Sequence, residues 1–544
     1  MGELSGRIER ATARGGAITF LHDDSAERVT WSQLHEEATA TAAGLQARGV
    51  GPGSHVALLG PTTRSLVTTI EATWLAGCTL VVLPLPMRLG SIEEFVDQTR
   101  RRVAGADAAL VVLDPELAPF LEPEAGDPPT VLFSDLAGTA AAFERPVVDE
   151  SALAVLQFTS GATADPKGVM LPHHTVLANL DAAAAAAGLH AGDDVLVSWL
   201  PLYHDMGLMK LTLAMITGTD FVLAPPQDFL ASPGRWMEWM SAFGGTASAG
   251  PNFSYALATR ALKHAGGLDL SRWRVCLNGA EPIHPSTVEA FCEAATPHGF
   301  DARAVFCAFG MAELTIAGTF PVPMTGMQVD PVDRRVLEIE RYAAPGDPSV
   351  DTTRRLARLG RPVPGLEMRV VDAGSGSLLS EREVGELQFR GPSVTSGYYR
   401  RPDATADAFD GDWLRTGDLA YVVEGELVLC GRMKDVIIVG GRNVFPEDVE
   451  RAAETVDGVR AGNVIAFGVE RGKGREGLVV VAETKSDDAG PLRQAVTRRV
   501  RQAIGLPPED VVFVSPGTLP KTSSGKLQRS LCRSRYLNAQ LQPV

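Results

Sequence analysis

The stretch Leu156 to Val169 reads Leu-Gln-Phe-Thr-Ser-Gly-Ala-Thr-Ala-Asp-Pro-Lys-Gly-Val, and it places hydroxyls, glycines and one cation behind an apolar run. Leu153 to Phe158 is predicted as a buried strand, and the loop after it offers N–H and O–H groups that can surround phosphate oxygens. Lys167 adds a mobile positive charge. The order of residues differs from the Walker pattern, because Pro166 precedes the lysine and Gly168 follows it. A phosphate-binding loop of another kind is the functional interpretation, and an ordinary surface turn is the alternative.

The composition is that of a globular protein. The 544 residues are 45% hydrophobic and 21% charged, which allows several domains with a large core. A formal net charge of -16 argues against a nucleic-acid-binding surface. The six cysteines form no C-x-x-C pair, so neither a zinc site nor a disulfide framework is predicted and a cytoplasmic location fits. The amino terminus lacks an apolar signal segment, and the longest apolar run, Leu80 to Met87, is too short to span a bilayer, so no stable membrane insertion is expected.

Helical and strand-like segments alternate through residues 1–150. Helical apolar spacing is present in Trp31 to Ala47 and Ser65 to Ala76, and buried strands are predicted at His55 to Leu59, Val81 to Leu85 and Ala109 to Leu113. Such alternation is typical of a parallel sheet covered by helices on both faces, so an α/β fold is predicted.

Three later strands run into segments that combine glycine with polar groups. The strands are Asp194 to Leu202, Val275 to Leu277 and Ala304 to Cys307, and they lead into Tyr203-His204-Asp205-Met206-Gly207, Asn278-Gly279-Ala280-Glu281-Pro282 and Ala308-Phe309-Gly310-Met311-Ala312-Glu313. Open α/β sheets bind ligands at the carboxyl ends of their strands. The three segments together therefore predict a shared nucleotide-binding cleft.

Single residues in this cleft admit two interpretations. His204 is either a core imidazole held by its neighbours or, with Trp199, the frame of a pocket for a substrate carboxyl group. Phe309 can stack on a purine, although an aromatic residue before a glycine usually serves packing. Glu313 can hold a metal ion that bridges phosphates, although a lone glutamate is usually solvated. Gly279 permits close backbone approach to a flat ring.

The last third of the chain adds a second unit. Trp413 to Asp418 places a carboxylate after a predicted glycine turn, where it can accept both hydroxyls of a ribose. Strands and helices beyond Lys434 form a small α+β module of about a hundred residues, a normal domain size. The tail from Leu519 to Lys526 is the last chemical candidate, and a frayed basic terminus is its alternative interpretation.

Six motifs in order resemble the adenylate-forming superfamily of acyl-CoA synthetases, nonribosomal adenylation domains and luciferases. They are Thr159 to Gly168, Asn278 to Pro282, Phe309 to Glu313, Thr416 to Asp418, Gly431 to Asp435 and Pro520 to Lys526. The resemblance implies that a carboxylate attacks the α-phosphate of Mg-ATP to give an acyl-adenylate and pyrophosphate, after which a thiol takes the acyl group. It also implies a large adenylation domain, residues 1–431, and a small mobile lid domain, residues 432–544.

The resemblance carries roles over position by position. The β- and γ-phosphates would contact Thr159, Ser160, Gly161, Thr163 and Lys167, with Mg²⁺ at Glu313 and Thr159. Adenine would be lined by Gly279, Ala280, Glu281, Ala308, Phe309, Gly310 and Met311. Asp418 and Arg432 would hold the ribose, Lys526 would bridge the α-phosphate and the carboxylate, His204 would serve the carboxyl pocket, and Lys434 would be the hinge.

Within the superfamily, Trp199 to Leu208 and Pro251 to Tyr255 look most like fatty acyl-AMP ligases, which pass the acyl group to a carrier protein's phosphopantetheine. The segment Leu314 to Leu359 is similar in place to the insertion of those ligases, although a tolerated surface loop is the other interpretation. Ala162 and Phe309 depart from the residues common in relatives, but neither departure removes a charge.

The sequence thus predicts an ATP-dependent ligase for a small-molecule carboxylic acid, fatty or otherwise bulky and hydrophobic. An acyl carrier protein is the expected acceptor, and coenzyme A is the alternative. A luciferase-like oxygenase is a further alternative on fold grounds. A non-catalytic acyl-AMP-binding protein would be expected to lack Lys526 or Glu313, and both residues are present. The sequence leaves the identity of the acid open.

Overall fold

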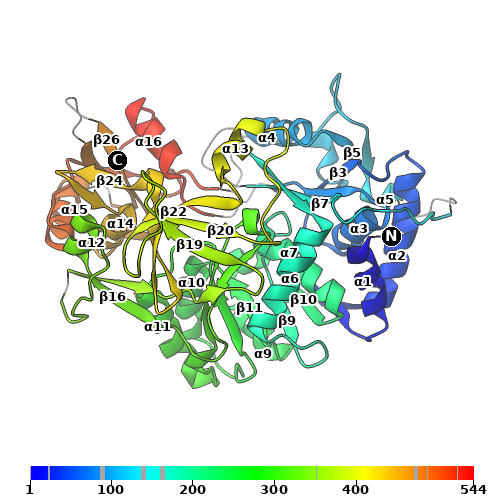
Figure 1. The fold of residues 1–544 in the computed structure, drawn as a ribbon, viewed down its shortest axis with the longest axis horizontal. Helices are drawn as coiled ribbons and strands as arrows, with labels where there is room; N and C mark the ends of the chain where they lie inside the picture. Colours follow the sequence, from blue (N-terminus) through cyan, green and yellow to red (C-terminus); the bar gives the residue numbers. More distant parts are fainter. Residues whose placement is uncertain are drawn as a thin grey trace.

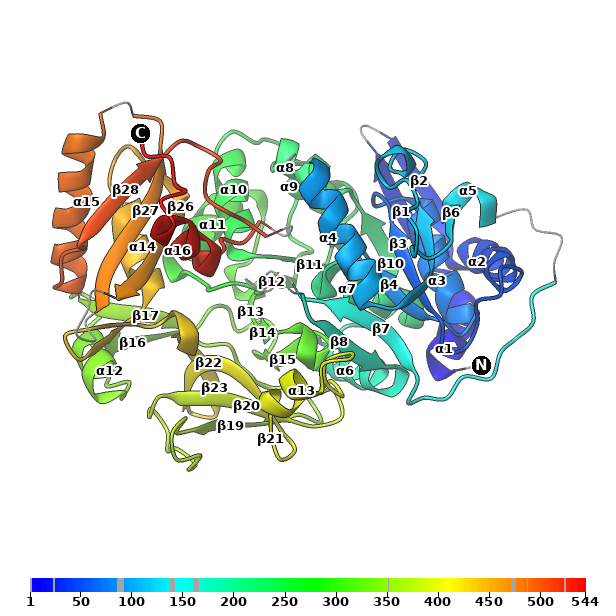
Figure 2. The same ribbon diagram turned by 90° about the horizontal axis from the view of Figure 1, so that it is seen from above.

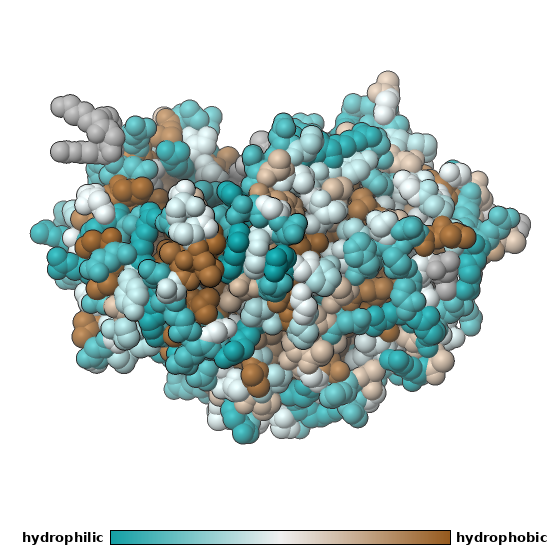
Figure 3. Space-filling model, viewed as in Figure 1, coloured by the Kyte–Doolittle hydropathy of each residue, from teal (hydrophilic) through white to brown (hydrophobic). Residues whose placement is uncertain are grey.

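The computed structural model describes residues 2–22, 25–85, 92–136, 142–159, 166–350, 352–470, 476–486, 488–522 and 525–544. Figure 1 shows two large sheets with their helices at the amino-terminal side and a smaller sheet at the carboxyl-terminal side. In these ranges no helix has the length and apolar character needed to cross a membrane. On the face drawn in Figure 3, apolar residues form patches separated by polar ones.

The first sheet has the strand order β13-β12-β11-β9-β10-β1-β2, and its strands are parallel except that β2 is antiparallel to β1. Its inner strands are short apolar runs, as expected for a sheet that is buried on both faces. The strands are β1 (Ala17–His22), β2 (Ser25–Thr30), β9 (Val195–Ser198), β10 (Asp220–Leu223), β11 (Ala247–Gly250), β12 (Val275–Asn278) and β13 (Val305–Cys307).

The second sheet has the order β6-β5-β3-β4-β7-β8 and is parallel except for the last pair, β7 and β8. The predicted phosphate-binding loop therefore lies in the connection between two antiparallel strands. The strands are β3 (His55–Leu59), β4 (Thr79–Val82), β5 (Ala108–Leu113), β6 (Thr130–Leu132), β7 (Leu153–Phe158) and β8 (Gly168–Pro172).

One apolar core lies between the two sheets. It joins residues from both sheets with residues of α5 (Phe133–Leu136) and of five longer helices, and these longer helices contact one another. The longer helices are α1 (Glu3–Thr12), α2 (Trp31–Gln46), α3 (Arg64–Leu75), α6 (His173–Ala187) and α7 (Asp205–Thr217). A Thr30 side chain and a Gln33 side chain form a capping box at the start of α2, which fixes where this helix begins.

The outer faces of the sheets are covered by further helices. An aromatic-rich core on the first sheet packs under α8 (Pro226–Ala231), α9 (Arg235–Ala242), α10 (Asn252–Leu262) and α11 (Pro285–Ala295). The outer face of the second sheet carries α4 (Ile92–Gly105), and the short helix α5 (Phe133–Leu136) packs into the core between the sheets. Single-turn helices are η1 (Ala118–Phe120), η2 (Thr296–His298), η3 (Ala302–Ala304) and η4 (Ala312–Leu314).

A third, antiparallel region follows the first sheet. It contains three small sheets with the strand orders β14-β15-β18, β16-β17 and β19-β20-β22-β21, and β23 pairs with β22 in the last of them. The elements are β14 (Phe309–Gly310), β15 (Ala317–Phe320), β16 (Val329–Asp333), α12 (Arg334–Glu340), β17 (Thr353–Ala357), β18 (Arg361–Pro362), β19 (Glu367–Val371), β20 (Gly385–Arg390), α13 (Pro402–Ala408), β21 (Phe409–Asp410), β22 (Trp413–Val423) and β23 (Glu426–Arg432).

The carboxyl-terminal unit has its own apolar clusters on the two faces of the sheet β26-β27-β28. Residues of α14 and α15 pack on one face, and Cys532 of α16 packs on the other (Figure 2). The elements are η5 (Met433–Asp435), β24 (Ile437–Val439), β25 (Arg442–Val444), α14 (Pro446–Glu454), β26 (Val459–Glu470), β27 (Glu476–Thr484), α15 (Ala489–Ile504), β28 (Asp510–Val514) and α16 (Arg529–Leu537).

The elements β16, α12 and β17, within the segment 329–357, pack against this unit. Both ribbon views place β16 and α12 beside α14 and α15, and Figure 2 also labels β17 there (Figures 1 and 2). Arg354 Nε donates to Asp448 Oδ1 at 3.0 Å, and Asn443 Nδ2 donates to the Glu338 carbonyl at 2.9 Å. The segment is therefore more than a surface loop. We call the following residues the seam: Arg334, Glu338, Arg354, Arg442, Asn443 and Asp448.

The predicted α/β fold with a small carboxyl-terminal domain is confirmed, and three local predictions were wrong. The strand expected from Val81 to Leu85 is Thr79–Val82 in the structure. The strand expected from Asp194 to Leu202 ends at Ser198, where the Leu200 N–H donates to the Ser198 hydroxyl at 3.3 Å instead of pairing with a neighbouring strand. Gly417 is not in a turn between elements. It lies inside β22 with a φ of +71°, beside an irregularity in the pairing, where glycine takes the left-handed conformation without strain.

Candidate active site

The loop between β7 and β8 is held to the sheet at its base. Thr159 N donates to the Lys167 carbonyl at 3.1 Å, which extends the strand pair by one step. The Lys167 ammonium lies 4.7 Å from the centre of the Tyr398 ring, a cation–π contact. Ser160, Gly161 and Thr163, three of the predicted phosphate ligands, lie outside the described residues.

Tyr398 connects this loop to Glu313. Its hydroxyl donates to Glu313 Oε1 at 2.8 Å. Tyr398 reaches this position because its backbone forms a bridge with Val169 in β8. Burial raises the pKa of Glu313, and the bond from Tyr398 opposes that rise. Tyr398 thus contacts a cation through its ring and a buried carboxylate through its hydroxyl.

The start of α7 supplies a histidine and an aspartate. His204 is the N-cap residue, and its Nδ1 lies 2.6 Å from Asp205 Oδ1. Burial raises the pKa of Asp205, but the charges of His204 and Lys526 outweigh burial and hold this pKa below its usual value. Asp205 is also close enough to Glu313 for its charge to raise the Glu313 pKa. His204 is thus part of a charged group, which favours the pocket interpretation over a core imidazole.

Lys526, in the carboxyl-terminal tail, lies near Asp205 and Glu281. Its backbone N–H donates to Thr522 Oγ1 at 3.1 Å, and the Thr522 N–H donates back to the Lys526 carbonyl at 2.8 Å. Burial lowers the pKa of the Lys526 ammonium, whereas the charges of Asp205 and Glu281 raise it. Ser523 and Ser524 lie outside the described residues. The described part of the tail is hydrogen-bonded at Thr522 and Lys526 and brings the ammonium near Asp205 and Glu281, so this part is not frayed.

Asp418 and Arg432 face each other across β22 and β23. They form a cross-strand pair, and Arg432 Nε lies 3.2 Å from Asp418 Oδ1. Burial raises the pKa of Asp418 to about 6 although the Arg432 charge opposes it, and the charge of Glu313 adds to the rise. The Arg432 charge also lowers the pKa of Lys526. The predicted ribose pair is therefore in electrostatic contact with the other candidate groups.

The segments predicted to line adenine lie side by side at the ends of β12 and β13. The Ala308 N–H donates to the Asn278 carbonyl at 3.0 Å, and a Cβ on Gly279 would lie 3.1 Å from the Ala308 carbonyl oxygen. Ala280 has a φ of +68°, a conformation that an alanine rarely adopts. Phe309 stacks on Phe389 with 5.8 Å between ring centres. This backbone strain and close approach are typical of a binding surface.

The other predicted adenine residues lie around this surface. Glu281 Oε1 accepts a hydrogen bond from the Phe253 N–H at 2.6 Å, and burial raises the Glu281 pKa. Gly310 has no room for a side chain, because a Cβ there would lie 1.8 Å from the Ile316 carbonyl oxygen. Met311 packs against the aromatic-rich core.

Sequence reasoning missed two members of the site. Asp205 stands inside the quoted motif after β9, and its position beside a histidine at a helix start was the available signal. Tyr398 carries no local signal, because only the long-range bridge to Val169 brings it to Glu313. Lys434, the expected hinge, is exposed in η5. In the described ranges no group of three or more His, Cys, Asp or Glu side chains forms a ready metal site.

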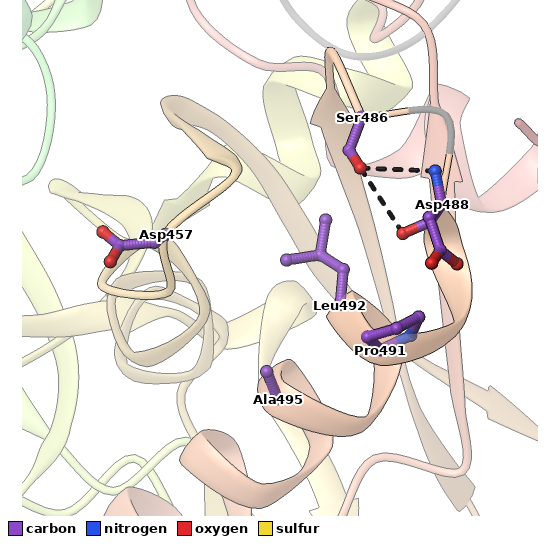
Figure 4. Close-up of a pocket in the computed structure, with 6 residues that line it drawn as sticks. All are labelled: Asp457, Ser486, Asp488, Pro491, Leu492 and Ala495. Atoms are coloured by element: carbon purple, nitrogen blue, oxygen red, sulfur yellow. Dashed lines mark hydrogen bonds between the residues drawn. The ribbon is translucent and has the colours of Figure 1, made fainter.

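A hollow of about 340 Å³ lies elsewhere, in the carboxyl-terminal unit (Figure 4). Ser486 Oγ accepts from the Asp488 N–H at 3.3 Å along its edge. The carboxylates of Asp457 and Asp488 disfavour an anionic acid or nucleotide there. Its lining is Asp457, Ser486, Asp488, Pro491, Leu492 and Ala495, so none of the candidate residues belongs to it.

Known proteins resemble this chain along nearly its whole length. The AMP-binding enzyme family matches residues 8–399. A Mycobacterium tuberculosis protein whose name calls it a ligase is 38% identical over 518 residues, covering 92% of this chain and 94% of its own. JamA of Moorena producens, a medium-chain-fatty-acid acyl-carrier-protein ligase, is 30% identical over 557 residues, covering 96% and 93%.

A solved structure gives the same result for the fold. A chain from a study of fatty acyl-adenylate ligases from E. coli and L. pneumophila superposes with a TM-score of 0.91 at 30% identity, covering 99% of this chain and 98% of that one. With a family match over more than half of the chain and such relatives, the chain belongs to the AMP-binding enzyme family and is an adenylate-forming ligase.

Proposed function

We propose that this protein activates a fatty or other hydrophobic carboxylic acid as its acyl-AMP and passes the acyl group to the phosphopantetheine thiol of an acyl carrier protein. The observation that carries the proposal is the position of Lys526. The tail brings this ammonium into a cleft with Asp205 and Glu281, while Arg432 and Glu313 lie in the same electrostatic neighbourhood. A carboxylate that attacks a phosphate needs a cation between the two anions.

The roles of the other groups follow from their places. Thr159 and Lys167 would contact the β- and γ-phosphates of ATP at the base of the loop, together with Ser160, Gly161 and Thr163. Asp418 and Arg432 would hold the ribose. His204 and Asp205 would frame the entry of the acid, because they stand at the positive end of α7, where an anion is stabilised.

Glu313 suits a magnesium ion by its chemistry. Burial raises the pKa of its carboxylate, so a bound cation would offset burial and stabilise the ionised form, and an oxygen-rich nucleotide would supply further ligands of the kind Mg²⁺ prefers. Thr159 would add a hydroxyl. When bound, the ion would neutralise charge on the phosphates. The chain's own share is to keep Glu313 oriented, which the Tyr398 hydrogen bond does.

The domain division belongs to the same proposal. Residues 1–431 would form the adenylation domain and residues 432–544 the lid, with Lys434 at the hinge. Support comes from the separate apolar clusters of the carboxyl-terminal unit and from the exposed position of Lys434 between β23 and β24. After adenylation the lid would rotate, Lys526 would leave the cleft, and a thiol would enter.

Two observations favour a carrier protein over coenzyme A as the acceptor. The seam joins residues 329–357 to the carboxyl-terminal unit through buried contacts, so any rotation must break them. A carrier protein has docking surface that can offset this cost, and coenzyme A has far less. The relative JamA is also named as an acyl-carrier-protein ligase.

The test is a pyrophosphate-release assay over a panel of free acids, followed by thiol transfer to coenzyme A and to holo acyl carrier protein in separate reactions. Acid-dependent pyrophosphate release with acyl transfer to the carrier is the expected result. Release without any acid, or efficient transfer to coenzyme A alone, contradicts the proposal. The matched control is Glu313→Gln, which keeps the shape of the side chain and should abolish release.

A further inference from the structure

Lys210 places a cation in an otherwise apolar part of α7. It stands one helical turn after Met206, so the two residues share a face of the helix. Met206 packs in the aromatic-rich core with Trp199 and Phe229, whereas Leu208 and its neighbours face the core between the sheets. The Lys210 side chain therefore belongs to the side of α7 that approaches the aromatic-rich core.

The ammonium of Lys210 lies where two strands of the first sheet separate. Its Nζ donates to the Val197 carbonyl at 3.0 Å, and Ser248 Oγ donates to the same carbonyl at 2.8 Å. The pairing of β9 with β11 ends at Val197 and Ser248. Trp236 Nε1 donates to Ser248 Oγ at 2.9 Å, which ties this point to the aromatic side chains.

At this point the Lys210 ammonium has more N–H groups than acceptors, and the Trp199 indole N–H has none in the described residues. An ammonium has three N–H groups, and in the part of the chain that the structure describes only the Val197 carbonyl accepts from Lys210 and no carboxylate pairs with it. Trp199, two residues after Val197, has a buried indole N–H without a partner in the same ranges. Burial lowers the pKa of Lys210 to about 7, against a smaller opposing effect of the Cys276 thiol. A buried donor such as the Trp199 N–H is normally satisfied, and Lys210 is half-buried.

We propose that Lys210 determines which acid is accepted, by donating a hydrogen bond to a second oxygen-bearing group at the far end of the substrate. The inference rests on the proposed function, because it places the activated carboxyl group beside His204. Lys210 lies six residues after His204, which corresponds to about 9 Å along the axis of α7 at 1.5 Å per residue. A medium-length chain with a remote carboxylate, hydroxyl or keto oxygen fits this spacing, and its methylene groups would contact the aromatic-rich core.

The experiment compares octanoic acid with the same chain ending in a carboxylate, a hydroxyl or a keto group, using the kcat/KM of pyrophosphate release. The parent enzyme should prefer at least one oxygenated acid by roughly 10-fold to 100-fold, the range expected for a hydrogen bond to a charged group. Lys210→Met should reverse this preference and Lys210→Arg should keep part of it. Lys263→Met, at an exposed lysine after α10, is the control and should leave the ranking unchanged.

If Lys210→Met does not fold, the pH dependence of kcat/KM for the parent enzyme tests the inference instead. The preference for the dicarboxylic acid should fall as pH rises through 7 and above, because Lys210 loses its proton, while octanoic acid should show no matching change. If the parent adenylates octanoic acid as well as every oxygenated acid, or if Lys210→Met keeps the parent's ranking, the inference is overturned and the proposed function stands. If no acid releases pyrophosphate, both are overturned.

Discussion

The carboxyl-terminal residues meet the rest of the chain on two sides, and the two contacts differ in kind. On the cleft side, Lys526 is held by the charges of Asp205 and Glu281, with no direct ion pair in the described residues. On the seam side, the side chains of Arg354 and Asp448 are 3% and 1% exposed and are directly bonded. A group held by charge at a distance can leave at little cost, whereas a buried pair cannot be separated cheaply.

This difference bears on the order of the two half-reactions. In the structure Lys526 is near Asp205 and Glu281 and the seam is closed, which is the arrangement that the proposed function assigns to adenylation. The charges in the seam are compatible with neutral pH: burial raises the pKa of Asp448, but Arg354, Arg451 and Arg334 outweigh burial and hold this pKa below its usual value. The stabilisation from Asp448 is thus present above its ordinary pKa and is lost only as pH falls through the lower, folded-state pKa.

The largest expected effect is on the seam. Arg354→Met leaves Asp448 buried without its direct partner, so the free energy of unfolding should fall by about 3 to 5 kcal/mol. Urea unfolding measures this change. Arg355→Met is the matched control, because Arg355 is the next residue and pairs with the exposed Glu289. Its cost should be about 1 kcal/mol or less. Equal costs for the two variants would show that burial of the Arg354–Asp448 pair is irrelevant.

A double variant separates a buried charge from lost packing. Arg354→Met combined with Asp448→Leu removes both charges, and replacing a buried ion pair by apolar groups is often neutral or stabilising. The double variant should therefore recover part of the stability lost in Arg354→Met, because Arg334 and Arg451 also lose Asp448 as a counter-charge. If it is no more stable than the single variant, the contact of the Arg354 guanidinium with the Phe445 ring, 4.3 Å away, carries the effect instead.

The second effect is on the cleft side. Lys526→Ala should slow acyl-AMP formation roughly 100-fold to 1000-fold, the usual cost of removing one donor to developing charge. Transfer from synthetic acyl-AMP to the thiol should change little, because in the proposed mechanism the lysine is away from the reacting groups in that step. Single-turnover assays of the two half-reactions give both numbers. Lys485→Ala, at an exposed lysine of the same unit, serves as control. Equal damage to both half-reactions would contradict a two-arrangement mechanism.

The third effect concerns Asp418, where one substitution should raise the free energy of unfolding and weaken nucleotide binding. Its pKa is raised to about 6, so the folded protein holds more protons than the unfolded chain between about 4 and 6 and the parent loses stability as pH rises through this window. Asp418→Asn should therefore be more stable than the parent above pH 6, by on the order of 3 kcal/mol. Thermal or urea unfolding from pH 4 to 8 should show the difference growing to pH 6 and then levelling.

The same variant should bind ATP more weakly, by about 1 to 3 kcal/mol, because the ribose hydroxyls lose an ionised acceptor. Calorimetric titration with ATP and with 2',3'-dideoxy-ATP is the measurement. The loss should shrink with the dideoxy analogue. A variant that still prefers ATP over the analogue as strongly as the parent would show that another residue reads the ribose.

The two sides also differ in how far the sequence predicts them. The cleft residues stand directly after strands or in glycine-rich segments, so Asn278, Phe309 and Asp418 can be recognised as candidates from the sequence alone. Local pattern carries this information because parallel strands end at a common edge. Tyr398 escapes prediction, since its place depends on a bridge to Val169, far away in the chain.

The seam cannot be predicted from the sequence, because it also depends on contacts between residues that are far apart in the chain. Arg354 and Asp448 are 94 positions apart, and each resembles an ordinary charged surface residue. Only the packing of residues 329–357 against α14 buries them together. The extent of Leu314 to Leu359 is predictable from motif spacing. Its contact with the carboxyl-terminal unit is a tertiary property, and so is the position of Lys210 at the separation of β9 and β11.

The smallest effect concerns acceptor choice, and a mild change in the seam reveals it best. Shortening the whole segment Leu314 to Leu359 would remove Val332, Leu337 and Leu356. The apolar residues packed with them, such as Tyr421 and Val428, would then be uncovered, which would confuse the result. Asn443→Ala removes only the bond to the Glu338 carbonyl, at a cost of about 0.5 to 1.5 kcal/mol. The lid should then rotate more readily, and acyl-CoA formation should rise roughly 2-fold to 10-fold while acyl-AMP formation stays constant.

Asn538→Ala is the control for this variant, because Asn538 is an exposed asparagine at the end of α16, away from the seam. Transfer to a holo carrier protein should change less than transfer to coenzyme A, since docking already offsets the cost of opening the seam. The rates of acyl-AMP formation, acyl-CoA formation and carrier loading are measured on the same preparation. If the parent already makes acyl-CoA efficiently without a carrier, the seam does not restrain the lid, and the protein acts as an acyl-CoA synthetase.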